Sequence, residues 1–261
     1  MRGRAGEGWL TAAAVAAIGR SAGAVLATKK KHLRALVGHD GRRSGPELEA
    51  ALARGFAASG FEVTSCGLIT TPGLAVLTRL REFDLGGMLS ASHNPAEDNG
   101  VKLFNGQGRK LSDEDELAIE ALLQRGMDEL ARGAVGPLQK GPPLRHDADL
   151  EKAYLGYLVD KAGAGLDLGG LTIVIDCSNG GGSRVAQSVF GRLSARSIAI
   201  HAEPDGDNIN RACGSTHPES LQAEVRRVGA DLGIALDGDG DRCLLVDERG
   251  QLLDGDALLA I

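Results

Sequence analysis

The sequence predicts an α/β protein of two tandem domains, each with a mainly parallel sheet covered by helices. Its 261 residues exceed the usual size of one domain and fit two compact units of about 100 to 150 residues each. Strand patterns alternate with helix patterns in two segments that share one order of elements. Such alternation is typical of parallel strands joined by right-handed crossovers.

The first predicted helix lies near the N-terminus. Two arginines, the apolar residues 9–19 and the small residues 21–24 together imitate a secretion signal. Apolar side chains recur at helical spacing in the same region, which favours an amphipathic helix capped by Thr11. These side chains are Val15, Ile18, Ala22, Val25 and Leu26.

The remaining elements follow in the same order twice. Residues 33–38 have the pattern of a buried strand, and 44–60 that of a helix with Ser44 as N-cap, Pro46 in the first turn and Gly60 just past the end. The first segment continues with a strand over 61–69, a helix over 71–80 opened by Thr71 and Pro72, and a strand over 85–92. The second segment repeats this order over 171–178, 183–194, 197–203, 217–229 and 231–238.

A helix and a linker are predicted between the two segments. Residues 112–126 begin with acidic side chains, which favour the first turn of a helix. Residues 136–149 are rich in Pro and Gly and predict the linker. The predicted domains are therefore 1–148 and 149–261.

The composition narrows the classes of function. The chain is 43% hydrophobic and 25% charged with a net charge of -6, so it lacks the excess of Lys and Arg that is typical of nucleic-acid binders. No apolar run is long enough to cross a bilayer. Four scattered cysteines without a CxxC pair indicate a reducing, cytoplasmic compartment. We therefore expect no nucleic-acid or membrane partner.

Two polar loops follow the third strand of each segment. The sequence SASHNP occupies 90–95, and DGDGDR occupies 237–242. Open α/β sheets bind ligands outside the carboxyl ends of their strands, so both loops are candidate sites.

The second loop predicts a metal site. Asp237, Asp239 and Asp241 alternate with glycines, and oxygen ligands favour Mg²⁺, Mn²⁺ or Ca²⁺. Three crowded carboxylates repel one another unless a cation offsets them. A plain Asp-Gly turn is one alternative. A calcium EF-hand is another, but Arg242 stands where that loop needs glycine, and strand patterns flank the motif.

The first loop contains a candidate nucleophile. Ser92 lies beside His93, although adjacent residues seldom face each other as nucleophile and base. An Asn-Pro turn is the structural alternative. Near a divalent cation, a serine hydroxyl can carry a phosphoryl group while a lysine supplies charge or a proton.

These motifs resemble those of a known family. Residues 90–104 and 233–242 are similar to the phosphoserine and metal loops of the α-D-phosphohexomutases, and 37–45 and 1–6 resemble two further segments of that family. Residues 203–219 most resemble the bacterial phosphoglucosamine mutases. The resemblance implies two three-layer α/β domains with mainly parallel mixed sheets, the first two of the family's four. The sugar and phosphate loops of the other two domains have no match in this sequence.

The resemblance also implies roles for the loop residues. Ser92 is expected to be phosphorylated in the active enzyme, with a phosphoserine oxygen joining Asp237, Asp239 and Asp241 as an Mg²⁺ ligand.

Four further residues match basic or loop positions of the family. Lys102 and Arg2 are expected near the reacting oxygen, where they assist proton transfer. His93 lines the same loop, and Arg242 is expected to steady the phosphate. Arg42 and Arg43 are left open between a phosphate contact and a solvated turn.

The implied function is a phosphosugar mutase. Its substrate would be a phosphosugar, with glucosamine 6-phosphate and glucosamine 1-phosphate as the favoured pair and a hexose 1,6-bisphosphate as intermediate and activator. The resemblance is compatible with a homodimer. The alternatives are a phosphoglucomutase or phosphomannomutase, a non-catalytic metal- or phosphate-binding fragment, and a haloacid-dehalogenase-like phosphatase with an Asp nucleophile.

Overall fold

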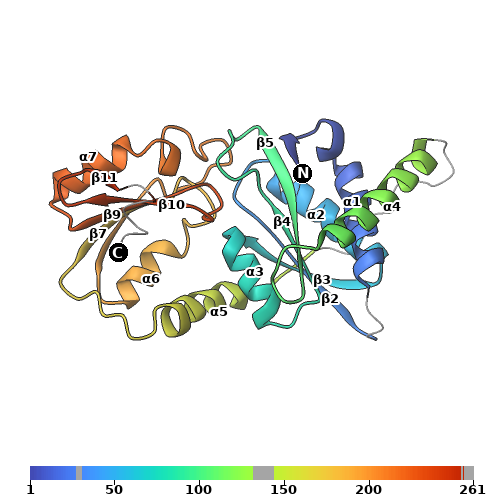
Figure 1. Ribbon diagram of the computed structural model, residues 1–261, viewed down its shortest axis with the longest axis horizontal. Coiled ribbons are helices and arrows are strands. Elements are labelled where there is room, and N and C mark those ends of the chain that lie inside the picture. The colour runs from blue at the N-terminus through green and yellow to red at the C-terminus, as the bar shows by residue number, and fades with distance from the viewer. Residues whose placement is uncertain (28–30, 132–143, 254, 256–261) are drawn as a thin grey trace.

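The computed structural model describes residues 1–27, 31–131, 144–253 and 255, and its two lobes lie side by side (Figure 1). Each lobe is built around one sheet. In the described part of the chain, the first lobe has the strand order β1-β5-β4-β2-β3-β6 and the second has β11-β10-β9-β7-β8.

The first lobe holds the N-terminal elements. Its strands are β1 (Arg2–Arg4), β2 (Leu33–His39), β3 (Phe61–Leu68), β4 (Leu85–Leu89), β5 (Asp98–Asn105) and β6 (Arg145–His146). Its helices are α1 (Ala12–Leu26), α2 (Gly45–Ala58), α3 (Thr71–Leu80), α4 (Asp113–Ala131) and α5 (Asp149–Tyr157), with short turns η1 (Gly8–Leu10) and η2 (Leu158–Ala162).

The second lobe repeats the central part of this order. Its strands are β7 (Thr172–Asp176), β8 (Arg196–Ile200), β9 (Leu232–Leu236), β10 (Cys243–Asp247) and β11 (Leu252–Leu253). Its helices are α6 (Ala186–Arg192), η3 (Gly214–Thr216) and α7 (Glu219–Val228).

The two sheets share one topology. Strand β2 pairs in parallel with β3 and β4, and β7 pairs in parallel with β8 and β9. An antiparallel strand then follows in each lobe, β5 beside β4 and β10 beside β9. The predicted α/β class with mainly parallel mixed sheets is confirmed, and the loops β4–β5 and β9–β10 occupy equivalent positions.

Helices cover both faces of each sheet, which makes three layers. On β2, Ala35 and Val37 pack in one apolar cluster with Leu52 of α2, whereas Leu36 packs in another with Leu74 of α3. This split follows from the pleat, because successive strand side chains point to opposite faces. In the second lobe, α7 and α6 contribute to different clusters in the same way.

The predicted N-terminal helix is confirmed as α1, and Thr11 Oγ1 accepts a hydrogen bond from Ala14 N at 3.3 Å. Helix α1 lies very close to α2. A Cβ at Gly55 would stand 2.2 Å from the carbonyl oxygen of Ala16, so this helix contact requires glycine.

Some boundaries and caps differ from the prediction. Ser44 makes no cap bond, and its Oγ instead accepts from Asn99 Nδ2 at 2.8 Å. Helix α3 begins at Thr71 as expected, but its capping side chain is Thr70, which accepts from Gly73 N. Helix α6 is shorter than predicted, and α4 extends past residue 126.

The predicted linker lies largely outside the described residues, which resume at 144. Its described end contains β6, which pairs in parallel with β3. Helix α5 then packs Leu150 and Tyr154 into the α3 side of the first lobe. The division at 148/149 stays a prediction. Within the described residues, no helix has the length and apolar character needed to cross a membrane.

A buried carboxyl of the first lobe predicts a pH-dependent stability. Glu49 Oε1 accepts from Ser65 Oγ at 2.6 Å, and burial raises the pKa of Glu49 from 4.5 to about 7. His39 Nε2 lies 3.8 Å from Glu49 Oε2 but supplies little positive charge, because burial and Arg184 lower the pKa of His39 to about 4.

The folded state therefore favours neutral Glu49, and this contribution is present below pH 4.5 and lost as pH rises through about 7. At about 1.4 kcal/mol per pKa unit, the loss is at most about 3.5 kcal/mol. We expect Glu49→Gln to flatten the fall in unfolding free energy between about pH 5 and pH 8, measured by urea titration. The exposed Glu47→Gln on the same helix is the control, and equal slopes for wild type and Glu49→Gln would contradict the assignment.

Candidate active site

The Ser92 loop (residues 90–97) and the acidic loop (residues 237–242) meet between the lobes. They leave the carboxyl ends of β4 and β9. Ser92 is fully buried, and its Oγ donates a hydrogen bond to Asp237 Oδ2 at 2.7 Å. Residues 145 positions apart in the chain are thus in direct contact at the place where open α/β sheets bind ligands.

The three aspartates of the acidic loop converge. Asp237, Asp239 and Asp241 each offer an oxygen atom within 4.8 Å of the others. Asp239 Oδ1 is buried and has no hydrogen-bond partner among the described residues. A buried carboxylate oxygen without a partner is costly, and a hard cation would satisfy it. The donor set therefore fits Mg²⁺.

The pKa values reflect this crowding. Burial, together with the charges of Asp239 and Asp241, raises the pKa of Asp237, although the Ser92 hydrogen bond opposes the shift. Burial also acts to raise the pKa of Asp239, but the charge and hydrogen bond of Lys102, with the hydrogen bond from Thr71, outweigh it and lower that pKa. Asp239 is thus held ionised, as a metal ligand must be.

Lys102 lies on β5, beside the acids. Its Nζ donates to Asp239 Oδ2 at 2.5 Å and to Asp241 Oδ2 at 3.0 Å. Thr71 Oγ1 also donates to Asp239 Oδ2. Lys102 and Thr71 thus both bond Oδ2 of Asp239, and neither bonds Oδ1.

Two more predicted residues pair at the edge of the site. Arg242 Nη1 lies 3.1 Å from His93 Nδ1, so this contact joins the two loops. Arg2 is different. It lies on β1 opposite Gly100 of β5 and is exposed, and among the described residues it has no hydrogen bond or ion pair to the other predicted site residues.

The sequence did not predict the role of Arg42, which holds the backbone of the Ser92 loop. Arg42 is fully buried, bonds Asp40 Oδ2 through Nε at 3.0 Å, and donates to backbone carbonyls of the loop. A solvated turn is therefore wrong for Arg42, whereas Arg43 is exposed and pairs with Asp207 of the second lobe. The motif of residues 37–45 marks this segment, but no sequence signal indicates which of its two adjacent arginines is buried.

The strands on either side of the acidic loop are confirmed as β9 and β10. An EF-hand needs helices in these places, so that alternative is wrong.

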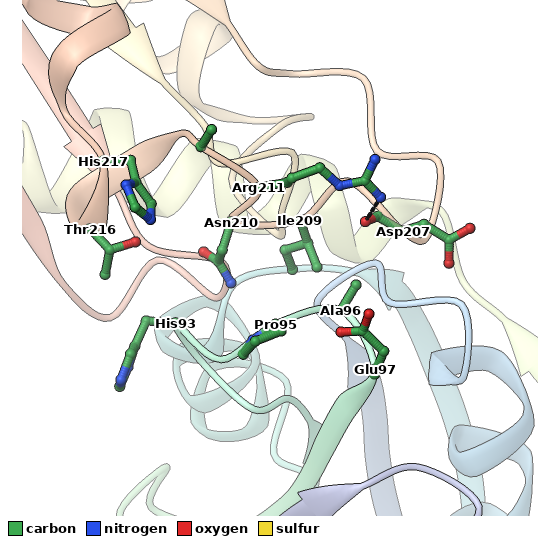
Figure 2. Close-up of a pocket in the computed structure, with 11 residues that line it drawn as sticks. His93, Pro95, Ala96, Glu97, Asp207, Ile209, Asn210, Arg211, Thr216 and His217 are labelled. Carbon is green, nitrogen blue, oxygen red and sulfur yellow. Dashed lines mark hydrogen bonds between the residues drawn. The ribbon is translucent and has the colours of Figure 1, made fainter.

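A pocket of about 410 Å³ adjoins the Ser92 loop (Figure 2). His93, Pro95 and Glu97 line it from the first lobe, and Asn210, Thr216 and His217 line it from the second. The pocket thus opens where the two lobes face each other, next to the serine.

Comparison with known families assigns both lobes to one class of protein. Each lobe contributes one of the two facing loops described above, and each matches one domain of that class. Residues 1–129 match phosphoglucomutase/phosphomannomutase, alpha/beta/alpha domain I, and residues 152–250 match domain II. The chain belongs to the phosphoglucomutase/phosphomannomutase family.

Within this family, the chain is similar to phosphoglucosamine mutases. A phosphoglucosamine mutase of Symbiobacterium thermophilum is 48% identical over 247 residues, which are 94% of this chain and 54% of that protein. A phosphoglucosamine mutase of Afipia carboxidovorans is 45% identical and aligns with 100% of this chain and 57% of its own length. The chain therefore spans little more than half the length of these relatives.

Solved structures agree with the fold. A phosphoglucomutase/phosphomannomutase family protein from Burkholderia thailandensis has a TM-score of 0.79 and 29% identity, covering 98% of this chain and 55% of its own. A structure from Thermus thermophilus, at a TM-score of 0.80 and 24% identity over 98% of this chain and 57% of its own, supports the fold alone.

Proposed function

We propose that this chain is the phosphoryl-carrying half of a phosphoglucosamine mutase, in which Ser92 passes a phosphoryl group to and from the sugar phosphate. The hydrogen bond of 2.7 Å between Ser92 Oγ and Asp237 Oδ2 is the observation that supports this most directly, because it brings a hydroxyl to a set of three acids. The names of the relatives support the choice of glucosamine phosphates.

In the proposed reaction, the bond between phosphorus and Ser92 Oγ breaks as a sugar hydroxyl oxygen bonds to phosphorus, which gives a hexose 1,6-bisphosphate. The phosphoryl group that the sugar carried at the start then transfers from the bisphosphate to Ser92 Oγ. This second transfer yields the isomeric monophosphate. Each step moves one phosphoryl group: the attacking hydroxyl gives up its proton, and the oxygen that leaves phosphorus takes one up.

The protein's contribution is position and charge. Asp237, Asp239 and Asp241 would hold Mg²⁺, whose charge offsets that of the phosphoryl oxygens. Lys102 lies within this set through its bonds to two of the acids, so it can supply charge or a proton there. Arg242 and His93, in contact at the edge, are proposed to steady the phosphate, and Arg2 to assist proton transfer.

Phosphorylation of the chain tests the proposal. Incubation with Mg²⁺ and glucosamine 1,6-bisphosphate should add one phosphoryl group, and tandem mass spectrometry should locate it on Ser92. Repeated absence of phosphate from folded protein would contradict the proposal. Phosphate on Asp237 would instead support the phosphatase alternative.

The sugar and the extent of activity need separate assays. Faster transfer from glucose or mannose 1,6-bisphosphate would favour a phosphoglucomutase or phosphomannomutase. A binding fragment remains the second candidate, because the chain covers 54% and 57% of the two relatives described above. It predicts Mg²⁺ binding without phosphorylation of Ser92 or isomerisation, and conversion of glucosamine 6-phosphate by this chain would remove it. We also propose a cytoplasmic enzyme, since all four cysteines are free thiols.

A further inference from the structure

Two backbone carbonyls of the Ser92 loop are each held from both lobes. The carbonyl oxygen of Ser92 accepts from Arg42 Nη2 at 2.9 Å and from Asn210 Nδ2 at 2.9 Å. The carbonyl oxygen of Asn94 accepts from the same two nitrogens, at 2.9 Å and 3.1 Å. One donor comes from the first lobe and the other from the second.

The first-lobe donor is a buried, neutralised cation. Arg42 is fully buried beside Asp40, which is also buried. Its Nη1 reaches two more carbonyls, those of Pro95 and Asp98. A buried guanidinium is tolerated only when it is paired and its donors are used, and here the loop backbone uses them.

The second-lobe donor sits where the two loops touch. A Cβ on Gly238 of the acidic loop would lie 2.8 Å from both Asn210 Nδ2 and the Ser92 carbonyl oxygen. Asn210 is buried and has a left-handed backbone, with φ of 58°, a conformation that asparagine tolerates better than most residues. Its amide is thus packed between the serine and the acids.

The serine itself needs such support. Ser92 has φ of 57°, and the left-handed region is strained for a residue other than glycine. Such a conformation persists where the surroundings over-determine it. Without fixed carbonyls on both sides of His93, the backbone could relax and turn the hydroxyl away from Asp237.

We propose that Arg42 and Asn210 form a clamp that positions Ser92 for phosphoryl transfer, and that the half supplied by Asn210 makes the order of the Ser92 loop depend on docking of the second lobe. Both are positioning residues, because they act through the loop backbone. The effect on transfer rests on the proposed function, whereas the effect on loop order does not.

Asn210 offers the cleaner test, because removal of buried Arg42 also leaves Asp40 unpaired. Asn210→Asp keeps the shape but replaces the donor nitrogen with an oxygen that faces two carbonyls. Asn210→Gly accepts the backbone conformation and removes the donor. Asn208→Asp is the matched control, since Asn208 Nδ2 donates to Glu203 O within its own segment.

Three quantities separate positioning from a general loss of structure. We expect hydrogen exchange in residues 90–98 to be about tenfold faster in Asn210→Asp and Asn210→Gly, with exchange in β3 unchanged, since each loses two hydrogen bonds. At saturating bisphosphate, Ser92 phosphorylation should slow by about tenfold or more, while the Mg²⁺ dissociation constant changes by less than about threefold. Asn208→Asp should match wild type.

Unchanged loop exchange in folded Asn210→Asp would overturn the clamp. So would a phosphorylation rate equal to wild type in that variant. Faster exchange in β3 together with weaker Mg²⁺ binding would also overturn it, because that result indicates a purely structural role. If wild-type protein accepts no phosphoryl group, the proposed function fails, and the exchange comparison still decides the clamp.

Discussion

Ser92→Ala is expected to abolish phosphorylation of the chain by glucosamine 1,6-bisphosphate, because the variant lacks the only hydroxyl that contacts Asp237 among the described residues. Mg²⁺ affinity should change by no more than about fivefold, since the three carboxylates remain and only one hydrogen bond to Asp237 is lost. Intact-mass spectrometry and calorimetric Mg²⁺ titration measure the two effects on the same sample.

Ser197→Ala is a suitable control for this experiment. Ser197 lies on β8, and its hydroxyl donates to Gln187 O. Neither residue belongs to the Ser92 loop or the acidic loop. The control should be phosphorylated at the wild-type rate. Phosphate uptake by Ser92→Ala at that rate would show that another residue is the acceptor.

Asp239→Asn is expected to remove most of the Mg²⁺ affinity. The substitution keeps the side-chain shape but deletes the charge of the most buried acid, whose Oδ1 has no other partner among the described residues. Removal of a residue that only supports a metal ligand weakens metal binding roughly 10- to 100-fold. The loss of a direct ligand should be at least as large. Phosphorylation of Ser92 should fall with it.

Thermal unfolding gives a second readout of that prediction. A ligand that binds only the folded state raises the unfolding temperature, so Mg²⁺ should stabilise wild type and the exposed control Asp167→Asn but not Asp239→Asn. Equal Mg²⁺ stabilisation of Asp239→Asn and wild type would contradict the metal assignment.

The fold was predictable because its signals are local. Alternating strand and helix patterns predict parallel strands. In such sheets the loops that follow β4 and β9 occupy equivalent positions at the carboxyl ends of the strands, where ligands bind. The caps were less predictable because a serine or threonine hydroxyl can bond either the adjacent helix backbone or a residue distant in sequence. Ser44 bonds Asn99 and does not cap α2, and Thr70 caps α3 while Thr71 bonds Asp239.

The site could be predicted in part. Ser92 and the three aspartates stood out because their residue types suit phosphoryl and metal chemistry. Arg42 and Asn210 act through backbone carbonyls of a loop that is distant in sequence, and no residue pattern encodes such contacts. Only the folded arrangement of the two lobes brings both side chains to the Ser92 loop.

The central claim is that Ser92 and the acidic loop share one cation. Phosphorus NMR of the chain phosphorylated on Ser92 tests it most directly, with Mn²⁺ in place of Mg²⁺, because paramagnetic broadening falls steeply with distance. We expect Mn²⁺ to broaden the phosphoserine signal in wild type and the signal to become sharp again when a chelator removes the Mn²⁺. A sharp signal in wild-type protein that has bound Mn²⁺ would contradict the claim.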